Sequence, residues 1–368
     1  MSTKKDKFSL KDKFYMEIAL KLANSRQGLT GTNPSVGCVI VKNDKIVSIG
    51  QTSYNGRPHA EFNAIENCID DLNGSKMYVT LEPCCHHGLT PPCTNIIIKS
   101  KISEVIYSVS DIDKRVRNKS LKILKLNKIK VKKGLLDDKI NNFYSNYFFN
   151  RKNQLPYVTG KIAVSKNNLI YSKLNKKITN RHSDKFTHLL RYKNDALMVT
   201  YKTLNNDNSK LNCRIKGFSN FSPKRIILDN KLQTKINTYV INTANKNNTL
   251  IFYNQAKKSK ILEFKNKKIQ LIKSKINQQG KFDIKAILKK LYTHNCRNLL
   301  IEGGDSLTSH LLKNKIFNRF YLYKSSKNIS KETEYLKFNS LDVLKKNYKN
   351  KFNLNLYLGK DKITLYKN

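Results

Sequence analysis

The feature that most constrains this chain is a set of metal-ligating residues spread over three short motifs. His59-Ala60-Glu61 supplies an imidazole and a carboxylate, and Pro83-Cys84 and Pro92-Cys93 supply two thiols. One imidazole and two thiolates suit Zn²⁺, and three protein ligands leave its fourth position open for a water whose pKa the metal lowers. A nearby carboxylate can carry protons for such a water. The pattern predicts a zinc-dependent hydrolytic deaminase with His59, Cys84 and Cys93 on the metal and Glu61 as the proton carrier.

Local patterns place these residues at the ends of elements. The segment 54–58 is typical of a turn, and the apolar spacing after it predicts a helix over 61–68, which puts His59 at the helix N-terminus. The segment 77–81 is typical of a short strand that ends just before Pro83. The alternative is a closed structural zinc site with His86 or His87 as the fourth ligand, but such a site gives Glu61 no role beside the metal.

The zinc loop also identifies a family by resemblance. The segment 80–93, TLEPCCHHGLTPPC, closely resembles the zinc loop of the bifunctional riboflavin-biosynthesis deaminase/reductases, and the segment 33–41, NPSVGCVIV, is similar to that family's first substrate loop and strand. The resemblance implies that Asn33 and His86 contact a pyrimidine nucleotide. It also points to a departure, because Leu89 stands where the family usually has arginine, so a phosphate or ribose contact is weakened or replaced.

A length of 368 residues is enough for two domains, each with its own core. Strands alternate with helices in the first part, which predicts a sheet with helices on both faces. The polar segment 150–156 ends in proline and is typical of a linker. We therefore expect two domains that meet near residue 150, and the resemblance implies a deaminase domain over 1–150 and a reductase domain over 151–368. By resemblance, the first is a cytidine-deaminase-like three-layer α/β/α domain and the second a dihydrofolate-reductase-like α/β domain.

The second part has its own markers. Asp283 is suited to cap a helix with one apolar face, and the segment 298–306, NLLIEGGDS, is typical of a strand that enters a glycine turn and then a helix. Such a turn is common without any ligand, and the chain has no Gly-x-Gly-x-x-Gly fingerprint for a Rossmann site. In context it resembles the family's NADPH domain. The resemblance implies two sets of contacts, one to NADPH and one to the substrate, and it places the arginines of the second set on the substrate phosphate. The NADPH contacts are Ala163, Thr203, Asp207 and Gly304, and the substrate contacts are Arg191, Leu211, Arg214 and Glu302.

The reductase part also departs from the family pattern. Asn167-Asn168 replaces an Asp-Gly pair, Asn175 replaces a substrate-binding serine, and Lys177 stands in a place usually held by tryptophan. A deaminase with a decayed reductase domain is therefore one alternative. In the C-terminal tail, the alternation of apolar residues over 352–358 predicts an edge strand that pairs with a strand near 363–365.

The net charge of +45 raises a second alternative, a nucleic-acid base deaminase, because a chain this basic binds nucleic acid through counterion release. However, the lysines are scattered and mixed with asparagine and isoleucine, as drift at tolerant surface sites would produce, and no RNA-binding signature appears. We expect small-molecule pyrimidine ribonucleotide substrates, no specific nucleic acid and no membrane partner. A third alternative is a non-enzymatic zinc scaffold. Such a protein would keep its fold in a Glu61→Gln variant and would show no loss of ammonia-forming activity.

Seven cysteines, no secretory signal and no long apolar run together predict a cytoplasmic protein. A homodimer or homotetramer is the expected assembly. The resemblance to the riboflavin-biosynthesis family implies an activity in two steps. The first is zinc-dependent deamination of 2,5-diamino-6-(5-phosphoribosylamino)pyrimidin-4(3H)-one, and the second is NADPH-dependent reduction of its ribosyl side chain to ribityl.

Overall fold

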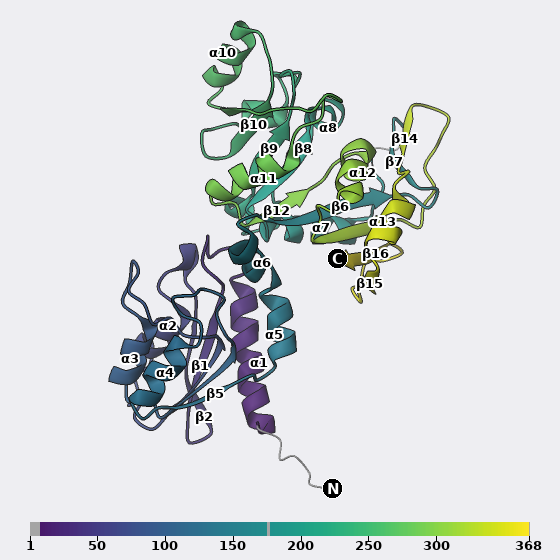
Figure 1. Cartoon of the computed structure of the whole chain (residues 1–368). Coiled ribbons are helices and arrows are strands. Elements are labelled where there is room, and N and C mark those ends of the chain that lie inside the picture. Colours follow the sequence, from purple (N-terminus) through teal and green to yellow (C-terminus); the bar gives the residue numbers. More distant parts are fainter. Residues whose placement is uncertain (1–7, 175–176, 368) are drawn as a thin grey trace. The chain divides into compact units, whose positions relative to one another are not determined.

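The chain folds into two compact units, residues 1–154 and 155–368, in a computed structural model that describes residues 8–174 and 177–367 (Figure 1). Asn175, one of the departures noted above, lies outside the described residues. The first unit ends at 154 and not at 150, because 150–153 form the end of helix α6 (Ser145–Asn153) instead of a linker.

The N-terminal unit is built on a five-stranded sheet with the order β2-β1-β3-β4-β5. Its strands are β1 (Gly37–Lys42), β2 (Lys45–Gln51), β3 (Lys76–Leu81), β4 (Glu104–Val109) and β5 (Lys130–Lys133). β1 is antiparallel to β2 and β3, whereas β3, β4 and β5 are parallel. The parallel strands bring their carboxyl ends to one edge, which is where ligands bind in such sheets.

Helices cover both faces of this sheet, as the sequence predicts. They are α1 (Leu10–Ser25), α2 (Ala60–Glu66), α3 (Cys93–Lys99), α4 (Lys119–Leu126), α5 (Asp137–Phe143) and α6. Figure 1 shows α2, α3 and α4 on one face and α1 and α5 on the other. The arrangement is a three-layer α/β/α domain, and it confirms the predicted cytidine-deaminase-like fold class.

Two glycines let helices lie close against the hairpin strands. A Cβ on Gly37 in β1 would collide with the carbonyl oxygen of Ala19 in α1, and a Cβ on Gly50 in β2 would collide with the carbonyl oxygen of Ala60 in α2. Only glycine fits at such positions. The contact at Gly50 matters for the site, because it fixes the first turn of the helix that follows His59.

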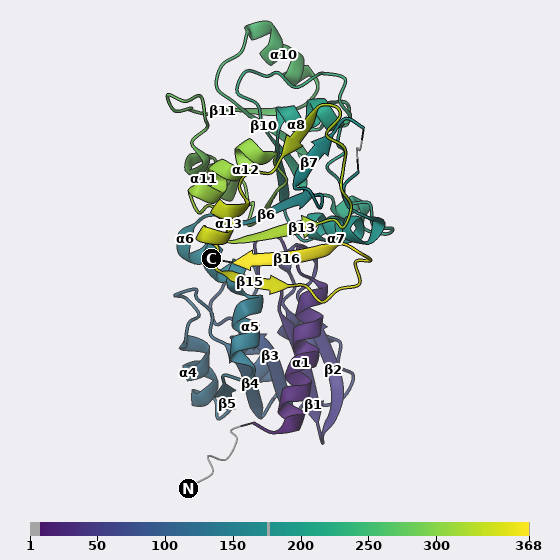
Figure 2. The same cartoon turned by 90° about the vertical axis from the view of Figure 1, so that its right-hand side faces the viewer.

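The C-terminal unit is built on a nine-stranded sheet with the order β11-β10-β9-β8-β12-β6-β13-β16-β15. Its strands are β6 (Tyr157–Val164), β8 (Ala196–Thr200), β9 (Lys224–Leu228), β10 (Thr249–Tyr253), β11 (Gln270–Lys273), β12 (Asn298–Ile301), β13 (Arg319–Lys324), β15 (Asn350–Asn353) and β16 (Lys362–Lys367). Strands β11 to β13 in this order are parallel, and β16 and β15 add an antiparallel edge, seen beside β13 in Figure 2. A separate pair, β7 (Leu169–Ser172) and β14 (Tyr335–Lys337), is antiparallel.

Alternating side chains give this sheet an apolar core on each face. Met198 in β8 and Ile226 in β9 belong to one core together with α11 (Ile284–Thr293), α12 (Asp305–Lys313) and α13 (Leu341–Asn347). Leu197 and Ile227 belong to the other, together with α7 (Arg181–Tyr192), α8 (Tyr201–Asp207), α9 (Tyr239–Asn242) and α10 (Lys258–Asn266). Helices on both faces of a mostly parallel sheet confirm the predicted α/β class of this domain.

Two details of the C-terminal unit concern specific predictions. The carboxylate of Asp283 accepts a hydrogen bond from the N–H of Ala286 at 3.1 Å and caps α11 as expected. For the C-terminal tail, the predicted hairpin is present, but the predicted edge strand over 352–358 is too long. β15 ends at Asn353, and Leu358 packs in the core instead of continuing the strand. Within the described ranges, no helix is long and apolar enough to cross a membrane.

Candidate active sites

The first candidate site brings three metal-ligating side chains together at the carboxyl edge of the N-terminal sheet. His59 is the N-cap of α2, Cys84 follows β3, and Cys93 is the first residue of α3. Their ligand atoms all lie within 4.8 Å of one another. Nδ1 of His59 is 3.5 Å from Sγ of Cys84 and 3.4 Å from Sγ of Cys93. One imidazole nitrogen and two sulfurs converging in this way form a donor set that suits zinc.

The electrostatics favour a thiolate at this site. Hydrogen bonding from Cys93 and from the His59 imidazole lowers the pKa of Cys84 to about 4, even though its burial acts in the opposite direction. The thiolate is the form of cysteine that binds metals. Neither His86 nor His87 belongs to the ligand group found among the described residues. The closed four-ligand site, the alternative considered from the sequence, is therefore not formed.

Glu61 lies in the first turn of α2, beside these ligands. Its side chain is buried, with 4% of the residue exposed. Burial raises the pKa of this carboxyl to about 7, while the nearby His59 acts to lower it. A carboxyl with a pKa near neutrality can both accept and release a proton, which is what a general acid–base group needs.

A cavity of about 100 Å³ opens beside Glu61 and the ligands. Its walls contain both residues expected to contact the pyrimidine. Asn33 donates from Nδ2 to the carbonyl oxygen of Gly56 at 2.9 Å, which fixes the side chain. His86 lines the cavity, and its buried Nδ1 has no hydrogen-bond partner among the described residues. Leu89 is 89% exposed and does not line the cavity.

A buried carboxylate ties the loop after β4 to the zinc loop. Glu82 accepts hydrogen bonds from the N–H of Asp111 at 3.3 Å and of Asn118 at 3.1 Å through one oxygen. Its other oxygen accepts from the hydroxyl of Ser120 at 2.6 Å. Because Glu82 immediately precedes Pro83-Cys84, the position of the loop is fixed relative to the metal ligands.

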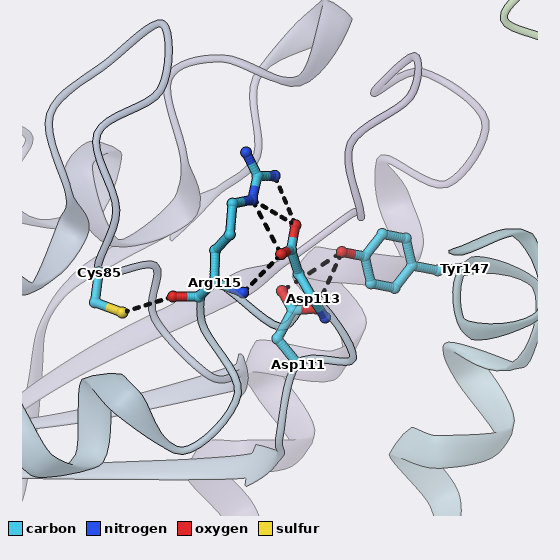
Figure 3. Close-up of polar contacts among 5 residues, drawn as sticks. All are labelled: Cys85, Asp111, Asp113, Arg115 and Tyr147. Carbon is cyan, nitrogen blue, oxygen red and sulfur yellow. Dashed lines mark hydrogen bonds and ion pairs between the residues drawn. The ribbon is translucent and has the colours of Figure 1, made fainter. Parts of the chain in front are cut away.

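That loop carries a polar cluster on the wall of the cavity (Figure 3). The guanidinium of Arg115 donates from Nε and Nη2 to the carboxylate of Asp113, the shortest contact being 2.6 Å. This pairing lowers the pKa of Asp113 to about 2. The hydroxyl of Tyr147 in α6 donates to Asp111 at 3.2 Å, and the thiol of Cys85 donates to the carbonyl oxygen of Arg115 at 3.4 Å.

The sequence did not predict several residues that line this cavity. They are Arg57, Asp113, Arg115, Tyr147 and Arg151. For Arg57 a signal was present, since it lies two positions before His59. Asp113 and Arg115 come from a loop that departs from the family's pattern, and Tyr147 and Arg151 come from a helix without a motif, so the fold was needed to place them.

The second candidate site lies at the carboxyl ends of the parallel strands of the C-terminal sheet, in a cavity of about 790 Å³. Six of the predicted residues line it. They are Ala163, Thr203, Asp207, Leu211, Glu302 and Gly304. Ala163 lies in β6, Thr203 and Asp207 in α8, and Glu302 directly after β12. Ligands of α/β sheets bind at this edge, where strand order changes direction.

Gly304 fits the role of a backbone contact to a phosphate. It is the N-cap of α12, so the free N–H groups of the first helical turn begin there. A Cβ placed on Gly304 would meet no atom within 4 Å, so the space in front of this turn is open. A helix N-terminus with open space suits an anionic group such as the phosphates of a dinucleotide.

The predicted substrate arginines lie in two different settings. Arg191 in α7 is buried, and it donates from Nε and Nη2 to the two carboxylate oxygens of Glu302 at 2.9 and 2.8 Å. Its Nη1 donates to the carbonyl oxygen of Asn212 at 3.2 Å. Arg191 therefore holds Glu302 and does not line the cavity. Arg214 is exposed, and its Nη1 donates to Oδ1 of Asn212 at 3.0 Å.

The sequence also missed a cation in this second cavity. Lys161 in β6 lines it, and burial lowers the pKa of its ammonium group, while Glu302 acts to raise it. Its Nζ lies 4.8 Å from the centroid of the Tyr323 ring. Lys161 lies two positions before Ala163 in the same strand, but among 71 lysines and arginines it had no distinguishing signal.

Each half of the chain matches the model of a known family. The family described as the cytidine and deoxycytidylate deaminase zinc-binding region matches residues 9–109. The family described as the RibD C-terminal domain matches residues 160–335. The riboflavin biosynthesis protein RibD of Aquifex aeolicus is 33% identical over 318 residues, which cover 86% of this chain and 87% of that protein. The RibD protein of Actinobacillus pleuropneumoniae is 34% identical and covers 87% of this chain and 85% of that protein.

The chain belongs to the RibD family. A solved structure of a diaminohydroxyphosphoribosylaminopyrimidine deaminase/5-amino-6-(5-phosphoribosylamino)uracil reductase from Thermotoga maritima is 27% identical, with a TM-score of 0.81. The match covers 97% of this chain and 98% of that chain. As a member of this family, the protein is a bifunctional enzyme of riboflavin biosynthesis with a zinc-dependent deaminase domain and an NADPH-dependent reductase domain.

Proposed function

We propose that the two sites act in succession on one pyrimidine ribonucleotide. The N-terminal site removes an amino group from 2,5-diamino-6-(5-phosphoribosylamino)pyrimidin-4(3H)-one, and the C-terminal site reduces the ribosyl side chain of the product to ribityl. The observation that carries the first step is the convergence of His59, Cys84 and Cys93 next to the buried Glu61. The second step is supported by the large cavity around Gly304.

In the first step the protein holds a metal and moves protons. His59, Cys84 and Cys93 would hold zinc, which when bound supplies a Lewis acid that activates water. Glu61 takes a proton and passes it to the departing amine, because its pKa of about 7 allows both transfers near neutral pH. Asn33 and His86 contact the pyrimidine from the wall of the cavity.

In the second step the protein positions two molecules and excludes water. Ala163, Thr203, Asp207 and Gly304 would line NADPH, which when bound supplies the hydride. Leu211 and Glu302 contact the substrate from the cavity wall. We assign Arg191 to holding Glu302 and Arg214, whose guanidinium is exposed, to the substrate phosphate.

The test follows ammonia release and NADPH oxidation together, using purified protein with the diaminopyrimidine ribonucleotide. We expect both signals. Glu61→Gln should abolish ammonia release, with a loss of at least about a hundredfold, while zinc stays bound. The same variant should still oxidise NADPH when given the deaminated substrate. Ammonia without NADPH oxidation would show a decayed reductase domain, and equal activity of Glu61→Gln would overturn the role of Glu61.

Two further expectations concern the whole protein. We infer a cytoplasmic location, because all seven cysteines are free and such thiols persist in a reducing compartment. We also expect a homodimer or homotetramer, which light scattering on the purified protein measures directly.

A further inference from the structure

The deaminase cavity contains more than one candidate for binding the phosphate of a ribonucleotide. Three arginines line it, namely Arg57, Arg115 and Arg151. A phosphate is held best by guanidinium groups that can offer two parallel N–H donors. Leu89, in the middle of the zinc loop, has no charge and does not line the cavity. The positive charge must therefore come from another segment of the chain.

Two of the three arginines already have interactions that weaken their attraction for an anion. Arg115 uses Nε and Nη2, the two donors of its fork, on the carboxylate of Asp113. Asp113 would also repel a phosphate placed there. Arg151 is exposed, and its guanidinium lies over the ring of Tyr147 at 5.4 Å from the centroid. Water screens a charge in such a position.

Arg57 differs from both. It is half-buried, and its Nη1 donates to the hydroxyl of Thr90 at 2.6 Å. Its Nη2 lies 3.7 Å from the place where a Cβ on Gly88 would stand. The guanidinium therefore contacts the zinc loop on both sides of Leu89. No carboxylate lies within ion-pair distance of Arg57 in the ranges 8–174 and 177–367.

The donors of Arg57 are arranged for an anion. Besides its contact with Thr90, Nη1 lies 3.4 Å from Nε2 of His59, whereas Nε and Nη2 have no hydrogen bond to the described residues. These two N–H groups point the same way and match two oxygens of a phosphate. A partly buried cation without a counter-ion has lost part of its hydration, so binding an anion stabilises it.

We propose that Arg57 binds the phosphate of the pyrimidine ribonucleotide in the deaminase site and that Thr90 fixes its orientation. Arg57 thereby supplies, from the segment just before His59, the charge that the zinc loop lacks at Leu89. The inference rests on the proposed substrate of this site.

The test compares the ribonucleotide with its dephosphorylated nucleoside as substrates for ammonia release. For Arg57→Gln we expect the KM for the ribonucleotide to rise about tenfold to a hundredfold, with kcat nearly unchanged. The kinetics with the nucleoside should not change. Arg117→Gln is the matched control, because Arg117 is exposed on the same domain and does not line this cavity. Zinc content and melting temperature are measured for each variant.

Rescue gives a second, independent readout. Adding Leu89→Arg to Arg57→Gln should lower the ribonucleotide KM again, because it restores a guanidinium next to Gly88. The inference is overturned if Arg57→Gln raises KM equally for both substrates, or if only Arg115→Gln raises it for the ribonucleotide. Wild-type protein that releases no ammonia from either substrate contradicts the proposed function itself, and the inference with it.

Discussion

At the scale of single residues, two buried glutamates show how surroundings set the behaviour of the same side chain. Burial raises the pKa of Glu61 to about 7. Burial acts in the same direction on Glu302, but the guanidinium of Arg191 outweighs it and holds the pKa of Glu302 at about 2. Glu61 can therefore exchange protons near neutral pH, whereas Glu302 stays charged and serves as a fixed acceptor.

The ion pair of Glu302 predicts how the stability of the C-terminal domain depends on pH. A carboxyl whose pKa falls from 4.5 to about 2 on folding stabilises the folded state above pH 4.5 and loses this effect as pH falls toward 2. The contribution is about 3 kcal/mol at most. Urea unfolding between pH 6 and 2 measures this contribution, with the hydrogen exchange of peptides from α7 as the signal for the C-terminal domain. Glu302→Gln should lower stability at pH 7 and flatten the dependence, and parallel curves for the two proteins would contradict the prediction.

At the scale of elements, the loop between β4 and α4 is ordered by a carboxylate from a different strand end. Glu82 satisfies two backbone N–H groups and one hydroxyl of this loop. The same loop carries Asp111, Asp113 and Arg115 onto the wall of the deaminase cavity. The shape of that wall therefore depends on a residue next to the zinc loop.

Replacing Glu82 should loosen this loop. In Glu82→Ala the donors of Asp111, Asn118 and Ser120 lose their acceptor, at a cost of about 1–3 kcal/mol for each one that stays buried. We expect faster hydrogen exchange over residues 110–120 and a lower kcat/KM for deamination. Glu82→Gln is the control, because its amide oxygen still accepts from the backbone and its amide nitrogen can donate to Ser120. Equal effects of the two variants would show that packing, not the hydrogen bonds, orders the loop.

At the scale of the whole molecule, both domains share a strongly positive charge of +45, from 71 lysines and arginines against 26 aspartates and glutamates. Such a field attracts anionic small molecules from solution, and its reach shortens as salt is added. The relatives that match most of this chain are riboflavin biosynthesis proteins, so its activity needs no nucleic-acid substrate to explain it.

The charge predicts weak binding to RNA that carries no sequence information. The affinity for single-stranded RNA should fall by about a hundredfold or more between about 50 and 200 mM salt, through the counterion effect. It should be the same for unrelated sequences, and cytosine in the RNA should release no ammonia. Fluorescence anisotropy across a salt series, with an ammonia assay on the same samples, measures both. RNA-dependent ammonia release would restore the nucleic-acid deaminase alternative.

The sequence alone determined the chemistry of the first site, because its residues belong to short motifs with types and spacings that few structures use. His59, Glu61, Cys84 and Cys93 could be predicted for this reason, and so could the helix cap at Asp283. Alternating strands and helices indicated the fold class of both domains. Element ends were less certain, since 150–153 joined α6 and β15 stopped at Asn353.

The meeting of side chains from distant segments depends on how the chain folds in three dimensions. The contact of Arg57 with Thr90 spans 33 positions, and the pairing of Arg191 with Glu302 spans 111. The motifs place Arg57 and Thr90 in segments that meet at the metal ligands, and the resemblance places Arg191 and Glu302 on one substrate. Neither specifies a contact between the two side chains. Each contact forms because segments far apart in the chain converge at the carboxyl edge of their sheet. Packing of the elements, and not local sequence, sets the distance between the two side chains.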